Sequence, residues 1–356
     1  MTDKLQRVIE SIRPLDEEAM ATARERQDQL TKPRGSLGKM EELSIRIAGM
    51  TGNPRPKLKK KAMVVMAADH GVAGEGISLY PQEVTRQMVH SFLAGTAAIN
   101  VLSKHIGARV TIVDMGVTGG FEPHPGLICK MIDFGTRDMT RGAAMSRQQA
   151  ITSIESGIEV IEDEIGNGLD IVGSGDMGIG NTTASSAISA AITGIPVVEV
   201  TGRGTGLGDD QLAGKVNIVE TAIEINTPNP ADPVDVLAKV GGFEIGGLAG
   251  VMLGAAAHRV PIVIDGFISG AASLIAYELC PVSKDYFIAG HRSVEKGHSA
   301  ILKHMGLEPL IDLNMRLGEG TGAALAMSII EASCKILDEM ATFEEADVSG
   351  SDKESV

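Results

Sequence analysis

The stretch Ala62-Met63-Val64-Val65-Met66-Ala67-Ala68-Asp69 decides the fold of this chain. Apolar side chains follow one another without interruption, and a carboxylate ends the run. Such a continuous apolar run is typical of a strand that is buried on both faces of a parallel sheet. The connector before it, Thr51 to Lys61, is rich in Pro, Gly and Lys and predicts a boundary between two structural units.

Similar apolar runs recur further along the chain, and helical patterns lie between most of them. In one of these helical patterns, isoleucines recur at spacings of three and four residues, with glutamates on the opposite side. Buried strands that alternate with helices predict an α/β fold with a doubly wound, mainly parallel six-stranded sheet. The further runs lie at residues 108–114, 169–173, 196–200, 260–265 and 286–289.

Small and polar residues follow most of these predicted strands. Because ligands of doubly wound sheets bind outside the carboxyl ends of the strands, we expect these segments to line the ligand site. Asp69, His70 and His291 lie at strand ends, where we expect them mainly to satisfy neighbouring backbone groups. The segments that follow the strands are 69–82, 173–183, 201–208, 265–270 and 290–293.

The two ends of the chain read as helices outside this alternating pattern. Two polar helices occupy residues 3–30, a short helix ends at Met50, and an apolar helix spans 321–338. We expect these segments to form a smaller helical domain. The predicted division is 1–60 for the N-terminal helices of that domain, 61–304 for the large α/β domain, 305–340 for a catalytic loop and the C-terminal helix, and 341–356 for an acidic, disordered tail.

The spacing Gly173-x-Gly175-x-x-Gly178 formally matches a dinucleotide-binding fingerprint, and Glu199 follows about 20 residues later. Against this match, the loop continues through Ile179-Gly180-Asn181 before a helix begins, and two predicted strands precede it. A dinucleotide-dependent oxidoreductase is therefore the main alternative function. A P-loop is excluded because Gly208 and Gly214 enclose one residue too many and Val216 replaces Ser or Thr.

The same segment also fits a cradle for the phosphate of a mononucleotide. Successive small residues expose backbone N–H groups, and the helix that begins at Asn181-Thr182-Thr183 adds its dipole. The segment 201–208 predicts a second cradle with Arg203 in reach, and the next helix contributes Lys215. Paired acids before such a loop, typical of sites for a diphosphate sugar with Mg²⁺, are missing. A nucleoside monophosphate donor is therefore favoured.

A single carboxylate stands between glycines in Arg316-Leu317-Gly318-Glu319-Gly320-Thr321-Gly322. Glycine lets the backbone turn sharply and approach a ligand closely, and Thr321 is the expected N-cap of the helix that follows. Glu319 would then point into the site as a general base. A glutamate that only complements the helix dipole is the structural alternative. The dipole lowers the pKa of Glu319 and burial raises it; we expect burial to prevail when ligand binds.

Composition excludes several functional classes. The net charge is −14 and no basic stripe is present, so nucleic acid is not an expected partner. The three cysteines are scattered, which fits a reducing cytoplasm. No stretch reaches the roughly 18 apolar residues that a membrane span needs, and because the N-terminus is charged throughout we do not expect it to act as a secretion leader. The eight histidines show no HExxH spacing, so no metal site is expected.

Together these segments resemble the nicotinate-nucleotide–dimethylbenzimidazole phosphoribosyltransferase family over residues 5–340. The resemblance implies a cytoplasmic homodimer with a Rossmann-like large domain and a small helical domain, and no metal or other cofactor. It also implies transfer of phosphoribose from nicotinate mononucleotide to 5,6-dimethylbenzimidazole or a similar azole; with dimethylbenzimidazole the product is α-ribazole 5′-phosphate for cobalamin biosynthesis. The motifs that carry it are Lys32-Pro33, Gly35–Gly38, Ala68–Val72, Tyr80–Thr85, Gly178–Thr183, Gly202–Gly206 and Arg316–Gly322.

The resemblance also implies roles for individual residues. Glu319 is similar to the general base, with Asp176 and Lys215 in support. Family members often carry Glu at Asp176, and the shorter side chain keeps the charge but not the reach. A non-catalytic nucleotide sensor is a further alternative, but it would have no use for Glu319. The implied nucleotide-binding residues are Gly178, Ile179, Gly180, Asn181, Thr182, Thr183, Gly202, Arg203, Gly204, Thr205, Asp265, Ser293 and Gly318, and the implied benzimidazole-binding residues are Ser78, Tyr80, Gln82, Gln87 and Leu317.

Overall fold

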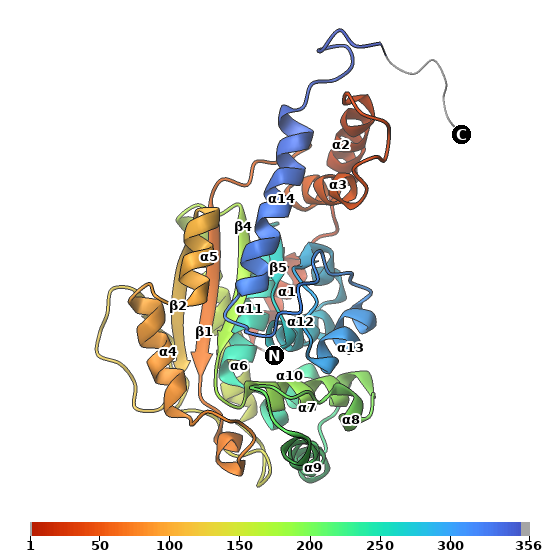
Figure 1. Ribbon diagram of the computed structural model, residues 1–356. Coiled ribbons are helices and arrows are strands. Elements are labelled where there is room, and N and C mark those ends of the chain that lie inside the picture. Colours follow the sequence, from red (N-terminus) through yellow and green to blue (C-terminus); the bar gives the residue numbers. More distant parts are fainter. Residues whose placement is uncertain (1, 350–356) are drawn as a thin grey trace.

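The computed structural model describes residues 2–349, which are built around one parallel sheet (Figure 1). Its strand order is β3-β2-β1-β4-β5-β6, and every neighbouring pair is parallel. Strand β1 is central and all of its residues are buried, which explains its continuous apolar run. The predicted doubly wound, six-stranded sheet is confirmed. The strands are β1 (Lys61–Ala68), β2 (Ala108–Gly116), β3 (Leu127–Cys129), β4 (Ile171–Met177), β5 (Ile262–Ile264) and β6 (Phe287–Ala289).

One predicted strand is wrong. Residues 196–200 form the single-turn helix α8 (Val197–Val200), in which Val198 is 56% exposed. The sixth strand is instead β3, three residues at the edge of the sheet that are only partly buried. A short apolar run does not distinguish a strand from a helical turn, and a three-residue edge strand has no run to detect.

Helices connect the strands and cover both faces of the sheet. They are α1 (Asp3–Ser11), α2 (Glu17–Gln29), α3 (Lys39–Thr51), α4 (Glu83–Leu93), α5 (Ala98–Ile106), α6 (Arg147–Gly166), α7 (Asn181–Thr193), α9 (Asp209–Asn226), α10 (Pro233–Val240), α11 (Phe243–Ala257), α12 (Phe267–Leu279), α13 (Lys296–Met305) and α14 (Thr321–Glu339), with 3₁₀ turns η1 (Gly71–Glu75) and η2 (Pro281–Tyr286). None of these helices is long and apolar enough to cross a membrane.

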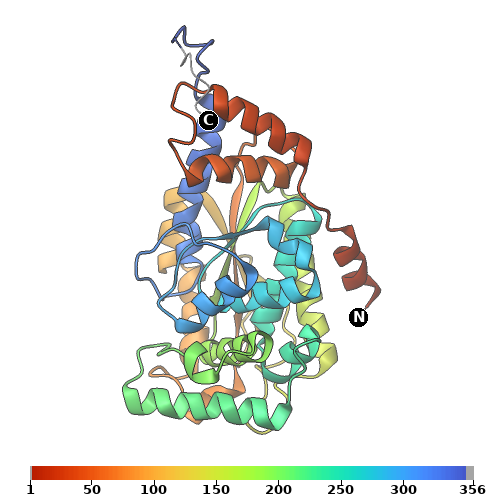
Figure 2. The ribbon, with the colours of Figure 1, turned by 90° about the vertical axis from the view of Figure 1, so that its right-hand side faces the viewer.

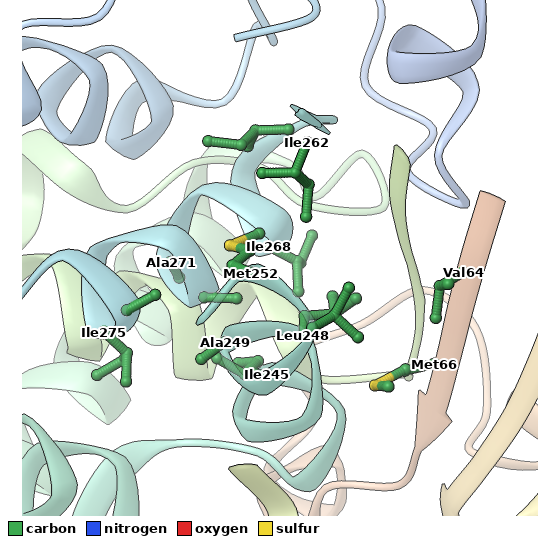
Figure 3. Packing of buried hydrophobic residues seen from close by; sticks show 14 of the residues in the cluster. Val64, Met66, Ile245, Leu248, Ala249, Met252, Ile262, Ile268, Ala271 and Ile275 are labelled. Atoms are coloured by element: carbon green, nitrogen blue, oxygen red, sulfur yellow. The ribbon is translucent and has the colours of Figure 1, made fainter. Parts of the chain in front are cut away.

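The two faces of the sheet are covered by different helices. Helix α11 packs on β1 and β4, with α6 behind it, whereas α14 packs on β4 and β5 from the other side and α5 packs on β2. The side chains of β1 show this division, because Met66 contacts Gly247 of α11 and Met63 contacts Gly320 at the start of α14. Figure 3 shows Val64 and Met66 on the same side as Leu248 of α11.

Helices α6 and α11 cross with their backbones in contact. A Cβ added at Gly157 would lie 1.8 Å from the carbonyl oxygen of Gly247, and one added at Gly250 would lie 1.9 Å from that of Ile154. Real side-chain carbons do not approach carbonyl oxygens this closely, so these positions accept only glycine. The crossing fixes the layer of helices on which the sheet rests.

Helices α2 and α3 and the end of α14 form a small helical unit at one end of the molecule (Figure 1). They share a separate apolar cluster of Ala23, Ile45, Ala48 and Leu337. Helix α1 does not belong to it, because α1 packs on α6 and α11 (Figure 2) and Lys4 Nζ lies 3.0 Å from Glu159 Oε1. The remaining predicted boundaries stay predictions.

The segment that follows α14 is partly ordered. Thr342 forms an antiparallel bridge with Leu30, and the N–H of Phe343 donates to the carbonyl of Gln29 at 2.9 Å. These contacts hold the start of the predicted acidic tail against the small helical unit. Residues 350–356, the rest of that tail, lie outside the described residues.

Candidate active site

A cavity of about 540 Å³ lies at the carboxyl ends of β1, β4, β5 and β6. Strand order reverses between β1 and β4, so the cavity is at the point where doubly wound sheets bind ligands. Its walls come from the segments 77–88, 176–182, 204–205, 266–268, 291–295 and 316–319. The predicted ligand segments therefore meet at one place, although not all of their residues face the cavity.

The loop after β4 forms one wall. Gly178, Ile179, Gly180, Asn181 and Thr182 line the cavity, and helix α7 begins at Asn181, so the positive end of its dipole faces the space. Thr183 is fully buried behind them. This arrangement suits an anionic group of a ligand.

The dinucleotide interpretation loses its main support, because Gly173 and Gly175 lie inside β4 and not in a loop. A Cβ at Gly173 would lie 2.5 Å from the side chain of Met63, and one at Gly175 would lie 2.3 Å from the carbonyl oxygen of Glu319. These glycines make room for neighbouring segments of the protein. They do not form a turn around a pyrophosphate.

A buried, hydrogen-bonded pair of His70 and Glu244 supports the same loop from below. His70 Nε2 lies 2.7 Å from Glu244 Oε1; the ring of His70 packs against Gly178, and its Cβ packs against Gly180. Burial lowers the pKa of His70, but Glu244 outweighs this effect and the pKa lies above its ordinary value. The expectation that His70 satisfies backbone groups is therefore wrong. It holds for Asp69, which accepts the Thr118 N–H at 2.8 Å.

In the 201–208 segment, Gly204 and Thr205 line the cavity, while Gly202 and Arg203 do not. Arg203 donates to the carbonyl of Leu207 at 2.8 Å and pairs with Asp209, so its guanidinium is used within its own turn. In this conformation the Arg203 guanidinium binds within its own turn, so it is not positioned to make the expected contact with a phosphate. Glu295, which the sequence did not single out, lines the cavity instead and accepts the Gly204 N–H at 2.9 Å.

Lys215 of α9 stands behind these two loops. Its side chain is 1% exposed, and Nζ donates to Thr182 Oγ1 at 2.8 Å. Burial lowers the pKa of Lys215 to about 8, and the nearby Glu295 only partly opposes this. An amino group whose charge changes near pH 8 therefore lies directly behind the first turn of α7.

Glu319 lies in a run of left-handed backbone. The φ angles are 85° at Gly318, 62° at Glu319 and 98° at Gly320. A glutamate in this region costs about 1–3 kcal/mol, so the surrounding structure has to hold it. The predicted N-cap is wrong: Gly320 is the N-cap, and Thr321 is the first residue of α14, where its hydroxyl donates to the Gly318 carbonyl at 2.9 Å.

Asp265 holds this loop from behind. Its Oδ1 accepts the N–H groups of Gly322 (2.7 Å) and Ala323 (3.0 Å), and its Oδ2 accepts that of Gly320 (3.1 Å). The carboxylate thereby satisfies three donors at the start of α14. Asp265 does not line the cavity, unlike Ser293, which the sequence grouped with it. A role as a clamp of the loop fits its position better than contact with a ligand.

The carboxylate of Glu319 lines the cavity and is 5% exposed. Its Oε2 accepts the N–H of Ile99, in the first turn of α5, at 3.4 Å. Burial raises the pKa of Glu319, Asp265 raises it further, and the N–H of Ile99 opposes them without cancelling them. The pKa of Glu319 therefore lies above its ordinary value, and the expectation for the ligand-bound site stays a prediction.

Asp176 is a second carboxyl group in the same wall. Its Oδ2 accepts from the Asn181 amide at 3.1 Å, and Oδ1 has no hydrogen-bond partner within residues 2–349. Burial raises the pKa of Asp176 well above its ordinary value, and Asp265 and Glu244 add to the effect. The shift favours the protonated form of Asp176 compared with an exposed aspartate.

The cavity is also lined by apolar side chains. Ser78, Tyr80 and Leu317 line it as expected, together with Val84 and Met88, which the sequence did not single out. Val84 and Met88 are spaced i, i+4 on α4, a helical pattern that could have identified this face. Gln82 precedes α4 and Gln87 lies on its exposed side, and neither lines the cavity.

Other cavity residues that the sequence did not single out are Ile77, Met177, Gly266, Phe267, Ile268 and Arg316, and His291, which was expected to satisfy backbone groups, also lines the cavity. Most of them flank segments that were expected at the site, so proximity along the chain was their only signal. Among residues 2–349, no group of three His, Cys, Asp or Glu side chains could hold a metal ion.

Comparisons with known proteins agree with this geometry. A family model described as phosphoribosyltransferase matches residues 12–348. The nicotinate-nucleotide–dimethylbenzimidazole phosphoribosyltransferase of Roseiflexus sp. strain RS-1 is 61% identical over 97% of this chain and 98% of the relative. That of Chloroflexus aggregans is 60% identical over 97% and 98%. The crystal structure of the same enzyme from Thermus thermophilus matches with a TM-score of 0.90 and 44% identity, and the match covers 95% of this chain and 100% of that one.

Proposed function

The chain belongs to the nicotinate-nucleotide–dimethylbenzimidazole phosphoribosyltransferase family, and from this premise we propose that it transfers the 5-phosphoribosyl group of nicotinate mononucleotide to 5,6-dimethylbenzimidazole. It is a phosphoribosyltransferase of cobalamin synthesis. The products of the proposed reaction are α-ribazole 5′-phosphate and nicotinate, with inversion at C1′. The observation that carries the proposal is the buried carboxylate of Glu319 in a cavity that is lined both by apolar side chains and by the first turn of α7.

The positive charge on the donor's pyridinium nitrogen favours cleavage of the bond to C1′. In nicotinate mononucleotide, C1′ is bonded to a positively charged pyridinium nitrogen. When that bond breaks, both electrons go to the ring nitrogen, which becomes neutral, so the leaving group requires no proton. For this reason the proposed mechanism needs neither a general acid at the leaving group nor a metal ion or other cofactor.

The protein has to assist the acceptor, because the acceptor must lose a proton. One ring nitrogen of the benzimidazole forms the new bond to C1′ on the face opposite the departing nicotinate, while the other nitrogen loses its proton. We assign this proton to the carboxylate of Glu319, whose raised pKa makes it a stronger base than an exposed glutamate. General-base assistance of this kind is worth about 10²–10⁴-fold in rate.

The polar groups of the cavity would hold the phosphoribosyl group. The first turn of α7, Gly204 and Ser293 line the cavity, and Lys215 adds positive charge behind them. Asp176 lines the same wall and, when protonated, would donate a hydrogen bond to a substrate. The apolar side chains of Val84, Met88 and Leu317 would receive the flat acceptor.

A direct assay tests the reaction. The purified protein is incubated with nicotinate mononucleotide and 5,6-dimethylbenzimidazole in the presence of a chelator, and the product is analysed by mass spectrometry and by NMR of the anomeric proton. We expect one nicotinate for each α-configured product. A β-configured product would contradict in-line transfer, and no product at all would contradict the assigned reaction. The homodimer and the cytoplasmic location stay predictions; light scattering that gave the 37.2 kDa monomer would contradict the first.

A further inference from the structure

The turn Arg203–Gly206 lies where three loops of the cavity meet. Gly204 and Gly206 have φ angles of 53° and 112°, which allow the chain to reverse within a few residues. Arg203 closes the turn by donating to the Leu207 carbonyl at 2.8 Å. On the side of the phosphate cradle, the Gly204 N–H is bonded to Glu295 at 2.9 Å, and Lys215 Nζ lies 3.0 Å from where a Cβ of Gly204 would be.

The same turn holds the acceptor loop, which we define as Ile77–Tyr80. The N–H of Leu79 donates to Thr205 Oγ1 at 3.0 Å, and Ser78 Oγ lies 3.4 Å from the same oxygen. Ser78 Oγ in turn accepts the N–H of Tyr80 at 3.1 Å. The hydroxyls of Thr205 and Ser78 thus replace the backbone partners that this loop lacks. Ile77 anchors the start of the loop with 3% exposure, whereas Leu79 and Tyr80 are 53% and 55% exposed.

The catalytic loop touches the turn as well. Arg316 Nη1 donates to the Gly204 carbonyl at 3.4 Å, and a Cβ at Gly206 would lie 4.0 Å from Arg316 Nη1 and 3.9 Å from Leu79 Cδ1. The short segment 204–206 therefore contacts the donor side, the acceptor loop and the loop that carries Glu319. The hydroxyl of Thr205 is the point at which this segment is bonded to the acceptor loop.

We propose that Thr205 is a positioning residue that couples acceptor binding to donor binding through its hydrogen bonds to the acceptor loop. This inference rests on the proposed function and adds that the two substrates bind cooperatively. A phosphoribosyl donor that contacts Gly204 and Ser293 orders the turn, and the turn then orders Ser78 and Leu79. Donor binding thereby supplies the free energy that is needed to order the acceptor loop, which acceptor binding would otherwise have to supply. By linkage, the acceptor tightens donor binding by the same factor.

The test measures binding without turnover, in protein that carries Glu319→Gln. Acceptor affinity is determined by calorimetry with and without saturating nicotinate mononucleotide. We expect the donor to tighten acceptor binding about fivefold, the effect of one or two hydrogen bonds of ordinary net strength. Thr205→Val, which keeps the shape and removes the hydroxyl, should reduce this factor to about one. Thr205→Ser, which keeps the hydroxyl, should preserve it.

Ser78→Ala provides an independent measurement from the other side of the contact and should also reduce the factor. A factor of one in the Glu319→Gln parent, or an unchanged factor in both Thr205→Val and Ser78→Ala, would overturn the coupling while leaving the transferase intact. If neither ligand bound the parent at all, the proposed function itself would fall, and the coupling with it.

Discussion

At the scale of single residues, the position of Glu319 depends on groups that are remote from any substrate. Its left-handed backbone is flanked by two glycines, Gly175 gives its carbonyl room, and Asp265 binds the N–H groups that follow it. Gly175 and Asp265 support the loop from outside the cavity, whereas Gly318 lines it. The position of the Glu319 carboxylate therefore depends on these supporting contacts.

Asp265→Asn tests the support. The amide keeps one acceptor oxygen but loses the second and the negative charge, so the start of α14 shifts and Glu319 with it. We expect kcat to fall about 10–100-fold and the donor KM to stay within about threefold. The reason is that a small displacement of a reacting group lowers the rate strongly. Asp312→Asn, an exposed aspartate, is the control. A fall confined to KM would mean that Asp265 contacts the donor.

Lys215 makes donor binding dependent on pH. Its pKa is lowered to about 8, so the ammonium is charged below this pH and neutral above it. The second pKa of a phosphate monoester is about 6, so the donor phosphate is mostly dianionic throughout this range. We expect the donor dissociation constant to rise as pH is raised from about 7 to about 9.5, and Lys215→Met to bind weakly and without this dependence. Affinity that stayed constant over this range in the unmodified protein would contradict a role for the ammonium.

At the scale of elements, the crossing of α6 and α11 is the least tolerant contact. Gly250→Ala places a methyl group against the Ile154 carbonyl, so the helices have to separate. We expect a loss of about 3 kcal/mol in the free energy of unfolding, measured in urea. The control is Gly214→Ala in α9, where a Cβ meets open space; alanine should stabilise this helix by about 0.5–1 kcal/mol. Equal stability of the two variants would contradict the close crossing.

The elements also show how far the sequence alone reaches. β1 was predictable because parallel neighbours bury both of its faces, and the ligand segments followed from their places after strands. The edge strand β3 was not, because three half-buried residues leave no pattern. The roles of Asp265, Glu244 and Glu295 depend on partners that lie far away along the chain, which no local spacing encodes.

At the scale of the whole molecule, the structure combines a large core around the sheet with a small helical unit beside it. Helix α2 buries only Ala19, Ala23 and Gln27, whereas nearly every residue of α11 is buried. Segments with few buried apolar contacts open at lower free energy than the core. We expect amides of α2 to exchange with deuterium well before those of α11. Simultaneous exchange of both helices would show that the chain opens as one unit.

The central claim is that Glu319 is the base of a phosphoribosyl transfer, and single-turnover kinetics of Glu319→Gln test it most directly. The control is Glu339→Gln, an exposed residue at the far end of the same helix. With saturating donor and acceptor, we predict that Glu319→Gln slows product formation by about 10²–10⁴-fold while the control keeps the rate of the unmodified protein. A Glu319→Gln rate within about threefold of the control would contradict the claim and assign the acceptor proton to another group.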